Sequence, residues 1–395
     1  MLTPSSGTRS TTSMQIGDPR AEIEAAAVAA LIDAADAGSA ASSAWSPGRC
    51  TLVGEHVDYA GGLVLCIAVD LGIAVAVRYG STPGFLVTSD GKTIHRAGPE
   101  PVGDIGDRVL APVVALRDRG LAIRSLEVGV AATLPAGIGL ASSAALAVAV
   151  TTAILRLTGT SMRGSELAEV ALIAERDVLG IPCGPLDQRA VVEAPDGGAL
   201  VLDCDSGSAS TVAWPWPDAV IVGCDTGTHH DVGGREYRTR RAETERGLAA
   251  VGVESCQELT VEAIEAAVLE PVVRRRLRHV MDESRRAGEA AEAMRRADLA
   301  GLGRLMSASH ASLRDLYEVS TTTLDAVVAA AEAASGCAGA RLVGAGFGGG
   351  VVALVSRAAA DACAAAMRAA CHGGTTFELR PSAGVAVLNP DVIRG

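Results

Sequence analysis

The sequence predicts an α+β protein with two domains. Its 395 residues exceed what one hydrophobic core usually holds. Short runs rich in Val, Ile and Leu, which are typical of buried strands, alternate with longer amphipathic stretches that are typical of helices. A proline-rich connection, WPWPD, separates two such series, and we place the domain boundary there, between residues 21–217 and 218–395. Residues 1–20 lack the apolar core of a signal peptide and are expected to form a disordered tail.

The hydrophobic pattern predicts the elements of the first domain in order. An opening helix is expected at residues 21–37, because its face is rich in Ala with acidic punctuation, and a loop at 38–48. Apolar runs at 63–69 and 73–77 indicate two strands of a buried sheet, separated by an aspartate and a glycine. The elements expected after these are a strand pair at 85–94, a helix at 107–119, a strand at 126–134, helices at 142–155 and 165–179, and a shaped loop at 180–188.

The second domain is expected to combine a few strands with long charged helices. Strands are indicated on both sides of the proline-rich connection, at residues 199–202 and 219–222. The remaining expected elements are helices at 235–248 and 261–304, a helix that ends near Ser335, and a strand, glycine turn and strand at 340–355.

Composition restricts the possible partners. Apolar residues make up 49% of the chain but aromatic residues only 3%, so the core has to be built from Ala, Val and Leu. The formal charge is −12, and the basic run at residues 274–278 is interpreted as a solvated helical face, which argues against nucleic acid. The nine cysteines form no metal-binding spacing and are expected to be reduced. We therefore expect a cytoplasmic protein.

One uncharged stretch, residues 128–155, is long enough to cross a bilayer. Proline, glycine and serine residues interrupt this stretch at its middle. The interruption favours a strand, a loop and a buried helix, so we expect no membrane partner.

The middle of that stretch, LPAGIGLASSAA at residues 134–145, predicts an anion-binding turn. Its glycines allow positive φ and close approach of the backbone to a phosphate, and the unpaired N–H groups at the following helix start point at the ligand. The lysine of a Walker loop is missing, and Lys92 is the only lysine in the chain. The charge on a nucleotide would therefore meet backbone N–H groups, arginines and a metal. As an alternative, Ser142 and Ser143 form an N-cap pair.

Ser143 and Glu175 are candidate ligands of Mg²⁺. Glu175 falls inside the apolar arc of the helix expected at residues 165–179, where an unpaired carboxylate is unfavourable. A hydroxyl and a carboxylate are hard oxygen ligands, which Mg²⁺ prefers. A bound cation would therefore account for both residues.

Two further polar groups are candidates for catalysis and sugar binding. Arg49, Glu55, His56 and Asp58 crowd together just before the buried sheet, and such a set of hydrogen-bonding groups suits a polyhydroxylated ligand. An aspartate in the constrained loop CGPLDQ, Asp187, could accept the proton of an attacking hydroxyl, with a nearby arginine stabilising the transferred phosphoryl group. The alternatives are a surface loop with incidental charges and a structural turn aspartate.

Three ordered motifs resemble those of the GHMP sugar and metabolite kinases, and within them the galactokinase branch. Residues 48–62 resemble the signature GRxNxIGEHxDYxxG, residues 135–145 the ATP-loop motif PxGxGLxSSAA, and residues 341–354 the third motif GAGFGG. The resemblance extends from about residue 45 to residue 355. It implies a two-domain GHMP kinase fold, with an N-terminal ribosomal-S5-like ATP domain, a C-terminal ferredoxin-like α/β domain, and the active site in the cleft between them.

The resemblance also implies a role for each matching position. It implies that Asp187 is the catalytic aspartate and that Arg49 is the cation beside it. The sugar-binding residues it implies are Glu55, His56, Asp58, Gly184 and Tyr237. The ATP-binding residues it implies are Pro135, Gly137, Gly139, Leu140, Ser142, Ser143 and Ala144, with Ser143 and Glu175 as the Mg²⁺ ligands.

The implied reaction is ATP-dependent phosphorylation of the anomeric hydroxyl of D-galactose by a monomer. Glu55 would repel the carboxylate of a uronic acid by about 1 kcal/mol or more, which disfavours galacturonate. N-acetylgalactosamine and arabinose remain alternative sugars, and a non-catalytic galactose and ATP sensor is an alternative function. Five positions depart from the family pattern, so the resemblance does not define the fine shape of the sugar pocket. These positions are Thr51, Cys66, Pro185, Leu186 and Gly350.

Overall fold

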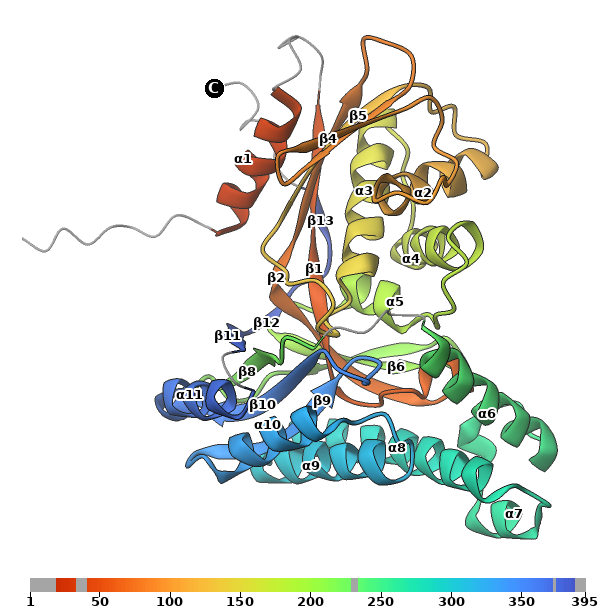
Figure 1. Ribbon diagram of the computed structural model, residues 1–395, viewed down its shortest axis with the longest axis vertical. Helices are drawn as coiled ribbons and strands as arrows, with labels where there is room; N and C mark the ends of the chain where they lie inside the picture. Colours follow the sequence, from red (N-terminus) through yellow and green to blue (C-terminus); the bar gives the residue numbers. More distant parts are fainter. Residues whose placement is uncertain (1–18, 33–40, 229–233, 372–373, 388–395) are drawn as a thin grey trace, which may run out of the picture.

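The structure is a computed structural model that describes residues 19–32, 41–228, 234–371 and 374–387 (Figure 1). The first helix, α1 (Pro19–Ile32), begins two residues before the expected start. The end of that expected helix and most of the expected tail, residues 33–37 and 1–18, lie outside the described residues.

The larger sheet holds nine strands of the described chain. Its main order is β13-β1-β2-β5-β3-β4, and β2 also pairs with β12 and with β6, which in turn pairs with β7. The pair β3 and β5 is parallel, and the others are antiparallel. The strands are β1 (Ser42–Val53), β2 (Leu63–Tyr79), β3 (Phe85–Ser89), β4 (Lys92–Arg96), β5 (Leu126–Ala132), β6 (Gly198–Asp203), β7 (Ala209–Ala213), β12 (Pro381–Ser382) and β13 (Ala386–Val387).

Strand β1 corrects the loop expected at residues 38–48. The strand runs through Pro47 and Gly48 and is buried along its whole length. The register with β2 shifts between these two residues. A proline has no N–H to donate to a regular ladder, and it is tolerated at such an irregularity. The proline and glycine therefore mark a bulge in a strand, and this bulge lies directly before Arg49.

Strand β2 corrects the prediction of two separate strands. It continues through Gly72, where an added Cβ would lie 2.6 Å from the indole nitrogen of Trp45. This glycine permits close packing on β1 instead of ending the strand. The single long strand connects the part of the sheet that pairs with β5 to the part that pairs with β6.

The smaller sheet is antiparallel, in the order β11-β8-β10-β9. Its strands are β8 (Ala219–Asp225), β9 (Cys337–Val343), β10 (Gly350–Ser356) and β11 (Thr375–Leu379). The change from the larger to the smaller sheet falls between β7 and β8, and we keep residues 21–217 and 218–395 as the proposed domains. Residues 381–387 rejoin the larger sheet through β12 and β13.

Helices cover both sheets. Helix α3 packs on β1 and β2, α1 packs on β2 and β5 from the other side, and α10 and α11 lie against the smaller sheet (Figure 1). No helix within the described ranges is both long and apolar enough to cross a membrane. The α-helices that follow α1 are α2 (Gly106–Asp118), α3 (Ser142–Thr158), α4 (Gly164–Ile173), α5 (Leu186–Glu193), α6 (Arg235–Val251), α7 (Val261–Ala266), α8 (Pro271–Arg295), α9 (Leu299–Asp315), α10 (Thr322–Ala333) and α11 (Ala360–Ala370).

The helix expected at residues 261–304 is divided among α7, α8 and α9. Pro271 begins α8, which suits a residue that has no N–H to donate, and Asp298 caps α9 by accepting the N–H of Gly301. The basic run on α8 is also not a simple solvated face. Arg276 is buried and forms ion pairs with Glu243 and Glu318.

Candidate active site

A cavity of about 670 Å³ lies where the polar segment after β1, the glycine-rich stretch and the turn between β9 and β10 meet. Of the predicted ATP-binding residues, Pro135 and Ala144 do not line it, and Ala144 is buried in the first turn of α3. The other predicted site residues all line it, namely Arg49, Glu55, His56, Asp58, Gly137, Gly139, Leu140, Ser142, Ser143, Glu175, Gly184, Asp187 and Tyr237.

The predicted catalytic pair is formed at the centre of this cavity. Arg49 Nη2 lies 2.7 Å from Asp187 Oδ1, and Arg49 Nη1 donates to the carbonyl of Gly139 at 2.5 Å. Burial alone would lower the pKa of Arg49, but the carboxylates of Asp187 and Glu55 outweigh burial and raise it. The guanidinium therefore stays charged and links the aspartate to the glycine-rich stretch.

Asp187 lies in the first turn of α5, which corrects the loop expected up to residue 188. The prolines and glycines of that segment end just before Leu186, where the helix begins. A carboxylate in the first helical turn interacts favourably with the positive end of the helix dipole. Its side chain is one-third exposed, so it is accessible from the cavity while it remains paired with Arg49.

Glu55 is buried at the other side of Arg49. Its Oε1 accepts the N–H of Gly344 at 2.7 Å and lies 3.7 Å from Arg341 Nη2. Burial raises the pKa of Glu55, while the charges of Arg49 and Arg341 act in the opposite direction. The carboxylate is thus held by the third glycine motif and by a buried arginine of β9.

Both ring nitrogens of His56 have protein partners. Burial, followed by the neighbouring His279, lowers the pKa of His56 to about 3, so the ring is neutral at physiological pH. The Nε2–H group then donates to the carbonyl of Ala345 at 3.0 Å, and Nδ1 accepts from the Tyr59 hydroxyl at 3.0 Å. A sugar hydroxyl would have to compete with these partners for either nitrogen.

Asp58 and Gly184 are packed directly against each other. A Cβ on Gly184 would lie 2.0 Å from Asp58 Oδ2, so a glycine is needed at this position for the carboxylate to fit. Burial, followed by the nearby carboxylates of Asp187 and Glu55, raises the pKa of Asp58 to about 6. The charge of Asp58 therefore changes within a practical pH range.

Tyr237 reaches the same pocket from α6. Its ring centroid lies 5.8 Å from that of His56 and 6.0 Å from that of Tyr59, edge to face with the latter. Composition and periodicity leave Tyr237 as an ordinary helix-face aromatic, and only the family resemblance singles it out. The structure brings it beside the polar segment from nearly 180 residues further along the chain.

The glycine-rich stretch has the backbone that its sequence predicts. Gly137 and Gly139 have φ values of 77° and 81°, and Ala141, the residue before α3, has a φ of 58°. Ala141 is the N-cap and no side chain caps the helix, so the alternative of an N-cap pair of serines is wrong. The first N–H groups of α3 lack acceptors within the helix and suit an anion.

The third glycine motif packs on this stretch backbone to backbone. A Cβ on Gly139 would lie 2.3 Å from the carbonyl oxygen of Val343, and one on Gly344 would lie 2.5 Å from the Cα of Gly139. Neither glycine can carry a side chain without moving the other segment. The resemblance implies that this motif packs beside the active site, and these contacts agree with that expectation.

The surroundings of Glu175 fit a divalent cation. The expected helix becomes a π-helical turn at residues 174–178, and such turns often occur at functional sites. The carboxylate is buried and accepts a hydrogen bond from Gln188 Nε2. Burial raises the pKa of Glu175, and a hydrogen bond from Ser143 opposes that shift. Among the described residues, no ion pair involves the Glu175 carboxylate. The same residues contain no group of three or more His, Cys, Asp or Glu side chains that could hold a metal ion, so a cation at Glu175 would need further ligands.

Two positively charged side chains at the cavity are not assigned to the site by the sequence analysis. Arg108 of α2 donates from Nη1 to Ser143 Oγ at 2.9 Å, and Lys92 of β4 lines the same cavity. Lys92 stands out as the only lysine, but nothing in the sequence connects it to the glycine-rich stretch. Arg108 lies on the exposed side of an amphipathic helix, where an arginine is unremarkable.

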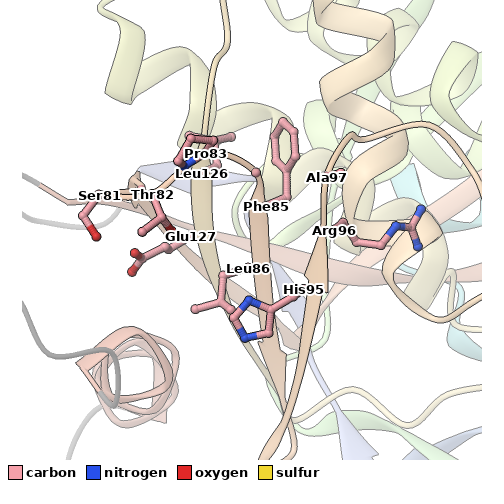
Figure 2. Close-up of a pocket in the computed structure, with 12 residues that line it drawn as sticks. Ser81, Thr82, Pro83, Phe85, Leu86, His95, Arg96, Ala97, Leu126 and Glu127 are labelled. Carbon is pink, nitrogen blue, oxygen red and sulfur yellow. The ribbon is translucent and has the colours of Figure 1, made fainter.

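A second hollow of about 450 Å³ lies against β3, β4 and β5 (Figure 2). None of the predicted site residues lines it. Its charged side chains include Arg96, which pairs with Asp104 and Asp107, and Glu127, which pairs with Arg78. These groups are neutralised by the protein, so the hollow has no evident chemistry.

Comparison with known proteins identifies the class to which the protein belongs. Three family models match the chain, described as galactokinase galactose-binding signature, GHMP kinases N terminal domain and GHMP kinases C terminal, at residues 36–79, 108–194 and 290–373. The fold and the cleft therefore define a kinase of the GHMP class.

Similar proteins narrow the assignment further. A galactokinase of Bos taurus is 36% identical over 360 residues, which cover 87% of this chain and 91% of the relative. One of Roseiflexus sp. is 34% identical over 345 residues, covering 84% and 87%. The crystal structure of Lactococcus lactis galactokinase complexed with galactose superposes with a TM-score of 0.83 at 28% identity, covering 88% of this chain and 95% of that one. The chain belongs to the galactokinase family, in which ATP is the co-substrate.

Proposed function

We propose that the protein transfers the γ-phosphoryl group of ATP to the anomeric hydroxyl of D-galactose, giving α-D-galactose 1-phosphate and ADP. The observation that carries this proposal is the 2.7 Å ion pair of Arg49 and Asp187. The pair lies between a carboxylate-rich end of the cavity, which suits sugar hydroxyls, and a glycine-rich end, which suits phosphates. Within this arrangement the two substrates meet at the aspartate.

The carboxylates have separate roles in this proposal. Glu55 and Asp58 accept hydrogen bonds from sugar hydroxyls, and Tyr237, Gly184 and His56 shape the rest of the sugar pocket. Asp187 accepts or orients the anomeric hydroxyl proton. Arg49 keeps that carboxylate oriented and stabilises negative charge on the transferred phosphoryl group. Phosphoryl transfer through a loose transition state needs positioning and charge neutralisation more than a strong base.

The phosphates are met by several kinds of group. The N–H groups of the glycine-rich stretch and of the first turn of α3 bind phosphate oxygens. Ser143 and Glu175 would hold Mg²⁺, which neutralises phosphate charge when it is bound. Arg108, already bonded to the Ser143 hydroxyl, and Lys92 supply positive charge in place of the missing Walker lysine.

The family departures support galactose as the sugar, because most of them lie away from the cavity. Thr51 and Cys66 are buried in β1 and β2. Gly350 lies where a Cβ would be 2.7 Å from the carbonyl of Ile138, so it serves packing. Of the five departures, Leu186 is the one that lines the cavity. We also propose that the protein is a cytoplasmic monomer.

The proposal is tested by ADP release from Mg·ATP over a panel of sugars. The panel contains galactose, N-acetylgalactosamine, galacturonate, arabinose and glucose. We expect galactose to give the highest kcat/KM and galacturonate to be among the poorest substrates, because of Glu55. Preference for another sugar would change the assigned substrate, and no sugar-dependent ADP release would favour a non-catalytic sensor.

A further inference from the structure

Helix α8 presents three buried polar side chains to the segment that joins β1 and β2. These side chains, His279, Glu283 and Ser284, are at most 4% exposed. Residues four apart on a helix share a face, so His279 and Glu283 point the same way. The segment they contact carries Glu55, His56 and Asp58, which lie more than 200 residues earlier in the chain.

Each of the three side chains satisfies a backbone group between Gly54, the first residue after β1, and Leu63, the first residue of β2. Glu283 Oε1 accepts the N–H of Gly54 at 2.8 Å, and His279 Nε2 donates to the carbonyl of Glu55 at 3.2 Å. Ser284 Oγ accepts the N–H of Leu63 at 2.9 Å. The backbone of Glu55 is therefore fixed on both sides by α8.

The protonation states agree with these hydrogen bonds. Burial lowers the pKa of His279 to about 4, so the neutral ring donates from Nε2 and its Nδ1 accepts from the Ser312 hydroxyl at 2.8 Å. Burial alone would raise the pKa of Glu283, but Arg286 and the other groups around the carboxylate together lower it. Ser309 Oγ donates to the same Glu283 oxygen at 2.5 Å, which keeps it in place.

We propose that His279 and Glu283 are positioning residues for the sugar: they hold the backbone of Gly54 and Glu55 so that the Glu55 carboxylate keeps its place relative to Asp187. The inference rests on the proposed function. Glu55 belongs to the segment after β1 and Asp187 to α5, so their separation depends on how each backbone is anchored. Small misplacements of such groups have large effects on catalysis.

The test compares His279→Gln with His279→Asn. A glutamine amide can reach the Nε2 position and still donate to the Glu55 carbonyl, whereas an asparagine amide reaches only the Nδ1 position toward Ser312. We expect the sugar KM to stay close to the wild-type value in His279→Gln and to rise about tenfold in His279→Asn. The KM for ATP should be unchanged in both, because the glycine-rich stretch makes no bond to α8 side chains among those described.

The measurements use whichever panel sugar the wild-type protein phosphorylates best, so this inference and the proposed substrate fail separately. Equal sugar KM values for the two variants, or parallel increases in the KM for sugar and ATP, would overturn the positioning role. If His279→Asn does not fold, Ser312→Ala replaces it, since this change leaves the ring in place but removes its orienting partner. A sugar KM increase of about threefold is then expected, and an unchanged value contradicts the inference.

Discussion

The two ends of the cavity, which we propose to bind the nucleotide and the sugar, are built in opposite ways. The nucleotide end is made mainly of backbone, with Gly137, Gly139 and Ala141 at positive φ and two glycine motifs in direct contact. The sugar end is made of side chains, with the carboxylates of Glu55 and Asp58 buried or half-buried. We therefore expect the nucleotide end to be sensitive to added atoms and the sugar end to be sensitive to changed charge.

The largest effect is expected where the two ends meet. Asp187→Asn keeps the shape of the side chain but removes the proton acceptor and the ion pair with Arg49. We expect kcat to fall about a thousandfold, with the sugar KM changed far less, because the lost interaction acts on the transferred proton. Steady-state ADP release measures both quantities.

Asp177→Asn is the matched control for this change. Asp177 is exposed in the π-helical turn and is bonded to the adjacent Arg176, so its loss should leave turnover unchanged. Near-full activity of Asp187→Asn would contradict the catalytic role assigned to that aspartate.

At the nucleotide end, Gly139→Ala tests the backbone contact. The methyl group would meet the Val343 carbonyl at 2.3 Å, at a φ of 81°. We expect kcat/KM for ATP to fall about a hundredfold, since the glycine-rich stretch has to move away from β9. Gly159→Ala is the control, because Gly159 has a φ of 68° with open space around its missing side chain. Equal ATP kinetics for the two variants would contradict the role assigned to the contact between Gly139 and Val343.

At the sugar end, Gly184→Ala adds an atom without changing charge. The methyl group would lie 2.0 Å from Asp58 Oδ2 and would displace that carboxylate. We expect the galactose KM to rise about tenfold while the ATP KM stays constant. Gly164→Ala, where the nearest atom is a Val192 methyl at 3.4 Å, is the neutral comparison. A selective loss of ATP binding in Gly184→Ala would reverse our assignment of the two ends.

The smallest effect concerns stability and pH at Asp58. Its pKa is raised to about 6 by burial and by neighbouring carboxylates, so ionisation of this group opposes folding above that pH. The folded protein has its full stability below the pKa that Asp58 has in the unfolded chain, where the carboxyl is protonated in both states. This contribution to stability is lost as the pH rises through about 6. Asp58→Asn should therefore stabilise the sugar-free protein at pH 8 by about 1 kcal/mol, and by less at pH 5. The same variant should bind galactose more weakly.

Denaturant unfolding at the two pH values checks this prediction. Destabilisation of Asp58→Asn at pH 8 would contradict the raised pKa. A pH-independent gain would indicate that packing, and not charge, limits stability at this position.

The sequence predicts the nucleotide end well because that end depends on local chemistry. Glycines at turn positions and an apolar stretch after them follow directly from backbone geometry, and α3 begins at Ser142 as predicted. The Mg²⁺ candidates also follow from periodicity, which places Glu175 in an apolar arc. The π-helical turn around Glu175 does not follow from the sequence pattern, which predicts an uninterrupted helix.

The sugar end is less predictable because it depends on contacts between distant segments. The sequence predicts a loop at Pro47, whereas in the structure the irregular register with β2 allows this proline within a strand. The sequence predicts a loop at Asp187 because prolines come shortly before it, although α5 begins at Leu186. His279 and Glu283 are ordinary polar residues of a charged helix until the fold brings them to Gly54 and Glu55.

The most direct test of the account is identification of the product by ³¹P NMR. Purified protein, Mg·ATP and D-galactose should give α-D-galactose 1-phosphate and ADP in equal amounts, and Asp187→Asn under the same conditions should give almost none. Phosphate on another hydroxyl, or no sugar phosphate from the folded wild-type protein, would contradict the assignment of Asp187 and the cavity around it.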